Sequence, residues 1–134
     1  MDGITAHLHR PLAVRLAAAL LAFSSGITVV DLVARPHSQT HIVTYAGTAV
    51  VELLFAWGFL QGRGWVRWAL LVPVTMGLLA SPGYFQHAST FGAFYFVGQG
   101  LLQVLALVLV FLKASNDWFR KRETAVNKPM LVPR

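Results

Sequence analysis

Long apolar stretches separated by short polar connections run through this chain. They cover about residues 12–34, 42–60, 65–80 and 91–112. A membrane-spanning helix needs about 20 residues, with a range of roughly 17–25, and the first, second and fourth stretches meet that length. The third is short unless it continues through Ser81, Pro82 and Gly83 to Phe85. Because backbone polar groups in hydrocarbon must be bonded internally, we expect helices rather than strands.

The composition also points to a bilayer as the solvent of this chain. Of its 134 residues, 56% are hydrophobic and 12% are charged, whereas soluble domains have roughly 25% charged residues. A soluble core of this length could not bury so much apolar surface. We therefore predict an all-α fold: an integral membrane four-helix bundle in which short connections make neighbouring helices antiparallel.

The bundle is predicted to occupy residues 1–126 as a single domain. The last residues of the chain, Leu131 to Arg134, match the recognition sequence of thrombin. We therefore interpret residues 127–134 as a tail left from protein production and exclude them from the predicted fold.

Basic residues are concentrated on one side of the predicted membrane. One side has Arg35 alone, and the other has Arg10, Arg15, Arg63, Arg67, Lys113, Arg120, Lys121 and Arg122. The positive-inside rule then places both termini in the cytoplasm, for a multi-pass protein of the inner membrane. The net charge of +6 is therefore a topology signal and does not predict nucleic-acid binding. We expect the segment Trp118–Arg122 to lie on the anionic inner leaflet.

Glu52 is the acidic residue inside the second apolar stretch. At roughly 1.5 Å per residue it lies about 15 Å from the outer end of that helix, close to the bilayer midplane. A charged residue at this depth costs about 2.5–3.5 kcal/mol on insertion scales, and even a neutral carboxyl group needs a partner. We interpret Glu52 as the titrating group of a proton- or cation-responsive site. The alternative is that it only holds the helices together by bonding a glutamine.

Polar residues on three predicted helices reach a depth similar to that of Glu52. Gln99 and Gln103 are four residues apart on the fourth helix and share one face. Stripes with comparable helical spacing on the first and second helices consist of Ser24, Thr28 and Asp31, and of Tyr45, Thr48 and Glu52. We expect the stripes to line one polar pocket open to the outside. Its candidate binding residues are Glu52, Gln99, Gln103, Thr48, Tyr45 and Asp31.

Several kinds of chemistry are excluded or disfavoured. Cysteine is absent, which excludes disulfides, thiol catalysis and thiolate metal sites. No histidine lies at mid-membrane, so haem ligation by two histidines in the bundle is not expected, and we predict no cofactor. The remaining candidates for a metal or pH-sensing site are the predicted external histidines His37, His41 and His87. Motifs for nucleotide binding, a catalytic triad or a zinc protease are missing, so the sequence leans against an enzyme.

Two segments of the chain resemble the DoxX-type small four-helix bacterial membrane proteins. They are VRLAAALLAFSSGI in the first helix and VELLFAWGFLQGRGWVRW in the second helix and its turn. In that group an arginine opens the first helix, a Ser-Gly or similar pair follows, and a glutamate lies in the second helix. The resemblance would carry over Arg15, Gly26 and Glu52 and implies a quinone- or redox-linked accessory role. The lysine often found near the end of the first helix is replaced here around Asp31.

Three functions follow from these patterns. The first is a small transporter or channel-like protein, acting as an oligomer, in which Glu52 exchanges a proton or cation for a small molecule. The second is a non-catalytic membrane partner, either an accessory subunit of a larger complex or an immunity protein against a pore-forming toxin. The third is the quinone-linked redox accessory role that the resemblance implies. The expected partners are the lipid bilayer and either further copies of the chain or other subunits of a membrane complex.

Overall fold

The computed structural model describes residues 10–34, 39–86 and 89–126. In this part of the chain all regular structure is helical, with five helices: α1 (Leu12–Ala34), α2 (Gln39–Gln61), α3 (Trp65–Phe85), α4 (Thr90–Phe111) and α5 (Lys113–Val126). Helices α1 to α4 are long and apolar enough to cross a membrane. The predicted all-helical fold with four apolar spans is therefore confirmed.

Helix α3 is longer than the predicted segment 65–80, because it continues through Pro82 to Phe85. A proline has no N–H group for the carbonyl four residues before it, which for Pro82 is the carbonyl of Leu78. The Ser81 hydroxyl donates to that oxygen at 2.7 Å and supplies the missing hydrogen bond. Serine side chains commonly stabilise prolines in membrane helices in this way. The extension gives α3 the length of a full span.

Helix α5 differs in part from the expectation for the segment Trp118–Arg122, because its two aromatic residues are buried whereas the basic residues after them are not. Leu112 has an extended backbone, with ψ of 149°, which ends α4 and turns the chain. The Ser115 hydroxyl then donates to the Leu109 carbonyl at 2.8 Å and ties α5 to the end of α4. Trp118 and Phe119 are buried, with exposed fractions of 4% and 0%. Their apolar rings are removed from the surface by the chain itself, so they do not act as an interfacial anchor.

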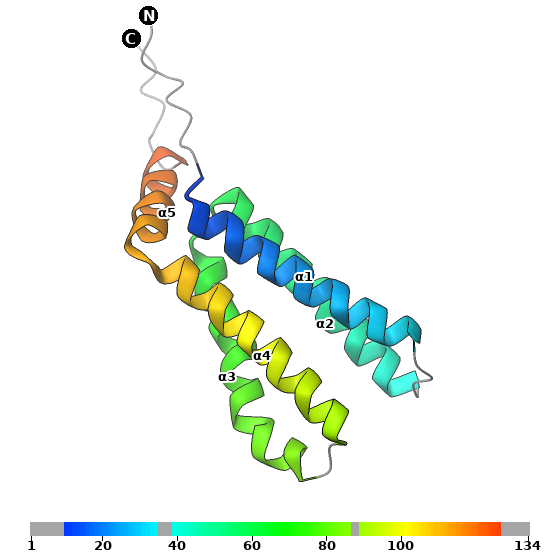
Figure 1. The fold of residues 1–134 in the computed structure, drawn as a ribbon. Helices are drawn as coiled ribbons and strands as arrows, with labels where there is room; N and C mark the ends of the chain where they lie inside the picture. The colour runs from blue at the N-terminus through cyan, green and yellow to red at the C-terminus, as the bar shows by residue number, and fades with distance from the viewer. Residues whose placement is uncertain (1–9, 35–38, 87–88, 127–134) are drawn as a thin grey trace, which may run out of the picture.

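The four long helices form two hairpins, α1–α2 and α3–α4, which lie together near α5 and diverge towards the opposite end (Figure 1). Helix α1 packs most closely against α2 and next against α4. Helix α3 packs against α4 and only slightly against α2, and within the described residues it does not approach α1 closely. The contacts therefore run from α2 through α1 and α4 to α3, and the packing between α3 and α2 is loose.

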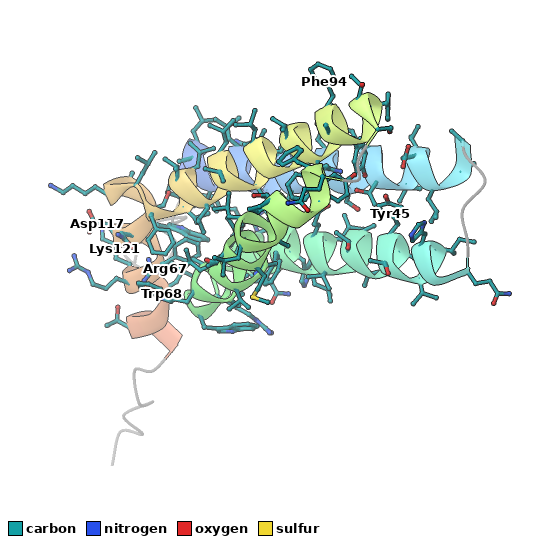
Figure 2. The ribbon with its side chains drawn as sticks, turned by 90° about the horizontal axis from the view of Figure 1, so that it is seen from below. Tyr45, Arg67, Trp68, Phe94, Asp117 and Lys121 are labelled. Carbon is teal, nitrogen blue, oxygen red and sulfur yellow. The ribbon has the colours of Figure 1, made fainter. Side chains whose placement is uncertain are left out.

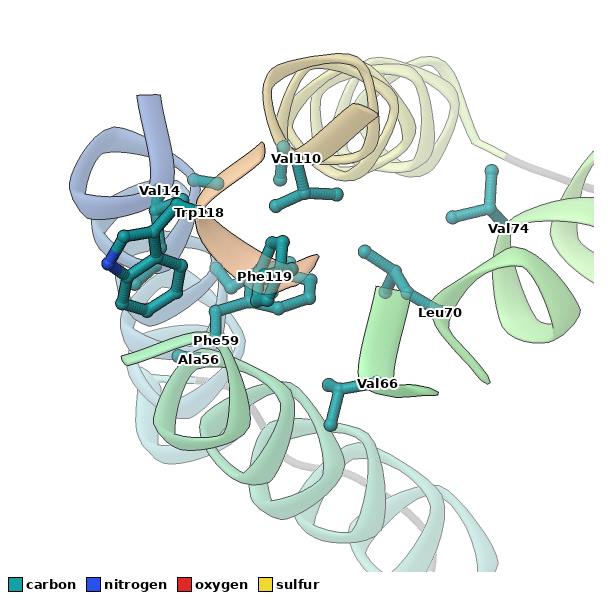
Figure 3. Packing of buried hydrophobic residues seen from close by; sticks show 13 residues of the cluster. Val14, Ala56, Phe59, Val66, Leu70, Val74, Val110, Trp118 and Phe119 are labelled. Atoms are coloured by element: carbon teal, nitrogen blue, oxygen red, sulfur yellow. The ribbon is translucent and has the colours of Figure 1, made fainter. Parts of the chain in front are cut away.

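The apolar core lies at the end of the molecule that α5 covers. Phe119 of α5 and Phe59 of α2 are fully buried there, with Val14 of α1 and Val110 of α4 (Figure 3). Small residues of α1, Ala17 among them, let the helices approach closely in this region. Since the interior of this end is filled by side chains from all the packed helices, a pocket inside the bundle must lie further along, where the hairpins separate.

Candidate functional site

The inner face of α1 changes from apolar to polar halfway along the helix. Ser24, Ser25 and Thr28 are all buried, with exposed fractions of 2% or less. The Ser25 hydroxyl donates to the carbonyl of Ala49 on α2 at 3.1 Å, and the Thr28 hydroxyl donates to the Ser24 carbonyl at 3.2 Å. Serine and threonine are small enough to lie between closely packed helices and still offer a hydroxyl group. Ser24 lies on the same face and contacts both α2, through Glu52, and α4, through Gln99.

Glu52 of α2 lies where these three helices meet, and only 3% of its surface is exposed. Its Oε1 atom accepts hydrogen bonds from Ser24 Oγ at 2.9 Å and from Gln103 Nε2 of α4 at 2.7 Å. Its Oε2 atom is buried and has no hydrogen-bond partner among the described residues. One oxygen of the carboxyl group thus joins α1, α2 and α4, while the other retains its capacity for a further bond.

Gln99 extends the network by one turn of α4. Its Nε2 atom lies within hydrogen-bond distance of the Ser24 carbonyl at 3.1 Å, Thr28 Oγ1 at 2.7 Å and Tyr95 Oη at 3.1 Å. Because a backbone carbonyl can only accept, its contact with Gln99 Nε2 fixes the orientation of the amide. The Oε1 atom of Gln99 therefore points to Ser24 Oγ, with which it forms a hydrogen bond.

The number of protons in this network has a chemical consequence. Ser24 Oγ contacts two oxygen atoms, Glu52 Oε1 and Gln99 Oε1, but a hydroxyl group has a single proton to donate. If that proton is donated to Gln99, the contact between Ser24 and Glu52 has no proton. A proton on the Glu52 carboxyl group would fill this gap and give a continuous chain of donors from Gln103 through Glu52 and Ser24 to Gln99. The contacts therefore accommodate one proton on the Glu52 carboxyl group.

This network borders a pocket of about 350 Å³ between the diverging hairpins. Volumes of this size lie in the range of small-molecule sites, about 300–1,000 Å³. One wall is polar and includes Glu52, Gln99 and Gln103, together with hydroxyl groups of α1, α2 and α4. The rest of the lining is apolar and comes from α3, with Pro73, Val74, Gly77 and Leu78, and from α4, with Phe96, Gly100 and Val104. The pocket is therefore suited to a molecule with one hydrogen-bonding side and one apolar side.

The structure brings five of the six candidate residues together. Those lining the pocket are Tyr45, Thr48, Glu52, Gln99 and Gln103. The sixth candidate, Asp31, is half-buried near the end of α1 and does not belong to the pocket lining. Of the polar stripe on α1, Thr28 lines the pocket. Ser24 belongs to the hydrogen-bond network around Glu52.

The proposed external histidine site is only partly within the described residues. His37 and His87 lie outside them. His41 is exposed and contacts the ring of Tyr45, with a distance of 6.4 Å between ring centroids. Within the ranges that the structure describes, no three metal-binding side chains of histidine, cysteine, aspartate or glutamate form a cluster.

Two further polar residues of the pocket, Tyr95 and Thr44, belong to none of the stripes identified in the sequence. Tyr95 lies four residues before Gln99 and donates to Thr28 Oγ1 at 3.1 Å. Its ring also meets that of Tyr45 edge to face, at 6.4 Å between centroids. Residues four apart share a helix face, so the spacing from Gln99 could have identified Tyr95. Thr44 also lines the pocket. It lies one turn before Thr48, so its spacing from Thr48 could have identified it in the same way.

Comparison of the chain with family models, curated proteins and solved structures gives no match. The resemblance to DoxX-type proteins therefore stays an expectation from the sequence. Of the three residues that it would carry over, Glu52 lines the pocket. Arg15 and Gly26 lie on the exposed surface of α1.

Proposed function

We propose that this chain is a proton- or cation-linked transporter or channel-like protein for small molecules. In this proposal α1 to α4 cross the inner membrane as an antiparallel four-helix bundle with both termini in the cytoplasm, and the protein acts as an oligomer. The observation that carries the proposal is the position of Glu52. Its carboxyl group is buried on the wall of a pocket, with one oxygen bound by two other helices and the other unpartnered.

The energetic balance supports a functional role for Glu52 over a purely structural one. Burying a charged side chain at mid-membrane costs about 2.5–3.5 kcal/mol. Hydrogen bonds between membrane helices contribute about 0.6 kcal/mol each on average. The bonds from Ser24 and Gln103 therefore do not offset the cost of burial, whereas an apolar residue at this position would need no such bonds. Retention of a carboxyl group is explained if its proton takes part in the function.

The shape of the pocket indicates the class of substrate. A hydrogen-bonding group would face Glu52, Gln103 and the hydroxyl groups near them, while an apolar part would pack against α3. The volume of about 350 Å³ limits the substrate to a small molecule. We therefore propose that the substrate is a small amphipathic compound. Its polar group would form a hydrogen bond with Glu52, and this bond would change when Glu52 gains or loses its proton.

The test is proton flux through the purified protein in liposomes that contain a pH-sensitive dye. A potassium gradient with valinomycin sets the membrane potential and drives the flux. We expect wild-type protein to raise the flux above that of empty liposomes and Glu52→Gln to reduce it to their level. The amide retains an oxygen that can accept from Ser24 and Gln103, so assembly and thermal stability should change little.

A matched control is Asp117→Asn, the same change from acid to amide on α5, far along the chain from the pocket. It should leave the flux unchanged. The proposal fails if wild-type liposomes conduct no more protons than empty ones. It also fails if the flux of Glu52→Gln equals that of the wild type.

A second candidate function is a membrane accessory subunit or a toxin-immunity protein. The observation in its favour is the loose packing of α3, which contacts little besides α4 and exposes Val72, Met76 and Leu79. Such a face could be covered by a partner protein. This alternative predicts that Glu52→Gln is nearly silent, while substitutions on the exposed face of α3 prevent copurification of the partner.

A further inference from the structure

A second pocket lies at the end of the molecule, where α5 packs beside α3 and α4. Its volume is about 610 Å³. Its lining consists of Arg67 from α3, Phe111 from α4, and Lys113, Asn116, Asp117 and Arg120 from α5. Arg67 and Asp117 lie at the same end of the molecule (Figure 2). The lining contains three basic side chains and one acidic side chain, which gives it an excess of two positive charges.

Arg67 is held in this pocket by aromatic rings and an amide. Its guanidinium carbon lies 5.4 Å from the ring centroid of Phe119, 5.7 Å from that of Phe111 and 5.8 Å from that of Trp68. Its Nη1 atom donates to the side-chain oxygen of Asn116. These contacts fix the position of the guanidinium group without neutralising it, since none of the described carboxylates forms an ion pair with Arg67.

The acidic residue of the pocket is already paired with one of its basic residues. Asp117 forms an ion pair with Arg120 at 3.2 Å. Both side chains of that pair are largely exposed, so water screens their attraction and it contributes little. Lys113 has no ion pair with a described carboxylate. Among the described residues, no carboxylate compensates the positive charges of Arg67 and Lys113, which favours an anionic ligand in this pocket.

We propose that this pocket binds the phosphate-bearing headgroup of an anionic lipid. The pocket lies at the boundary of the apolar spans, where α3 begins and α4 ends. Trp65 and Trp68 are exposed there, with exposed fractions of 61% and 57%, as is typical of residues at the headgroup level. The guanidinium group presents N–H groups in a fork that matches phosphate, and basic pockets between membrane helices commonly bind such headgroups. This proposal does not depend on the role of Glu52.

Native mass spectrometry of the delipidated full chain in an uncharged detergent tests the proposal. The probes are phosphatidylglycerol and phosphatidylcholine with identical acyl chains. We expect one phosphatidylglycerol molecule to bind in preference to phosphatidylcholine. Removing a charged hydrogen-bond donor should weaken this binding about tenfold in Arg67→Gln. Arg63→Gln, which removes an exposed charge outside the pocket, should not change it.

Because Arg67 packs among three rings, Arg67→Gln can also disturb the fold. Lys113→Gln resolves this, since Lys113 is exposed and its loss should weaken phosphatidylglycerol binding several-fold with an unchanged melting temperature. Equal binding of the two lipids, or equal effects of Arg63→Gln and Lys113→Gln, would overturn the proposal. Complete displacement of phosphatidylglycerol by millimolar inorganic phosphate would also overturn it, because the pocket would then be a site for the free anion.

Discussion

Replacement of Gly62 by alanine tests the docking of α5 against the turn between α2 and α3. Gly62 has a φ angle of +74°, a region in which a side chain costs about 1–2 kcal/mol. A Cβ atom at this position would lie 2.9 Å from Cη2 and 3.2 Å from Cζ3 of Trp118, and 3.3 Å from Cδ of Arg122. The substitution therefore has two separate costs, one from the backbone and one from the contact with α5.

The two costs can be separated because the contact needs the six-membered ring of Trp118. The overpacking should add roughly 1–3 kcal/mol to the backbone cost, for a total of about 2–5 kcal/mol in Gly62→Ala. In a Trp118→Leu background the ring is absent, and only the backbone cost of about 1–2 kcal/mol should remain. The coupling energy between the two positions should then be about 1–3 kcal/mol.

The assay is reversible unfolding of four proteins in mixed micelles: the wild type, both single variants and the double variant. The coupling energy follows from their free energies of unfolding. If Gly62→Ala has the same effect with and without the Trp118 ring, α5 does not dock on the turn. If Gly62→Ala does not destabilise the protein at all, the positive φ angle at this position is also refuted.

Two other predictions concern the packing of α2 against α3 and the hydrogen bond from Ser24 of α1 to Glu52 of α2. Gly58→Ala should destabilise the protein by roughly 1–3 kcal/mol, because its Cβ would lie 2.7 Å from Cγ2 of Val66. Gly47→Ala on the same helix meets nothing within 4 Å and should be neutral or stabilise by up to about 1 kcal/mol. Equal melting temperatures for these two variants would contradict the packing of α2 against α3. Ser24→Ala should destabilise the protein by about 1–3 kcal/mol, because Glu52 loses a hydrogen-bond donor. Unfolding in micelles measures this change. An unchanged stability would show that Ser24 does not join the helices.

Much of the fold could be predicted from the length of the apolar stretches, since a bilayer requires about 20 residues per helix. The meeting of Glu52 with Gln103 could also be anticipated, because both residues lie at similar depth in their helices and a buried carboxyl group needs a donor. The same reasoning did not give the role of Gln99. It bonds Ser24, Thr28 and Tyr95 and reaches Glu52 only through Ser24.

Other features depend on contacts that local patterns do not contain. The extension of α3 past Pro82 requires the Ser81 hydroxyl to bond the Leu78 carbonyl, and nothing in the composition of that segment demands it. The burial of Phe119 depends on α5 turning back onto residues far away in the sequence. An aromatic pair followed by basic residues is equally suited to a membrane surface, so the pattern alone does not show whether the two rings lie on the membrane or are buried in the protein.

The position of the core bears on the kind of transport that the pocket can support. Glu52 lies about 10 Å along α2 from Phe59, at roughly 1.5 Å per residue. Phe59, Phe119 and Val110 are fully buried, so side chains fill the space between the pocket and the end covered by α5. An open pore through one chain would have to displace this core, which costs several kcal/mol for each large side chain. A pocket closed at one end by a packed core favours stepwise transfer, in which Glu52 takes up and releases a proton, over an open pore, and the proton flux in liposomes tests that transfer.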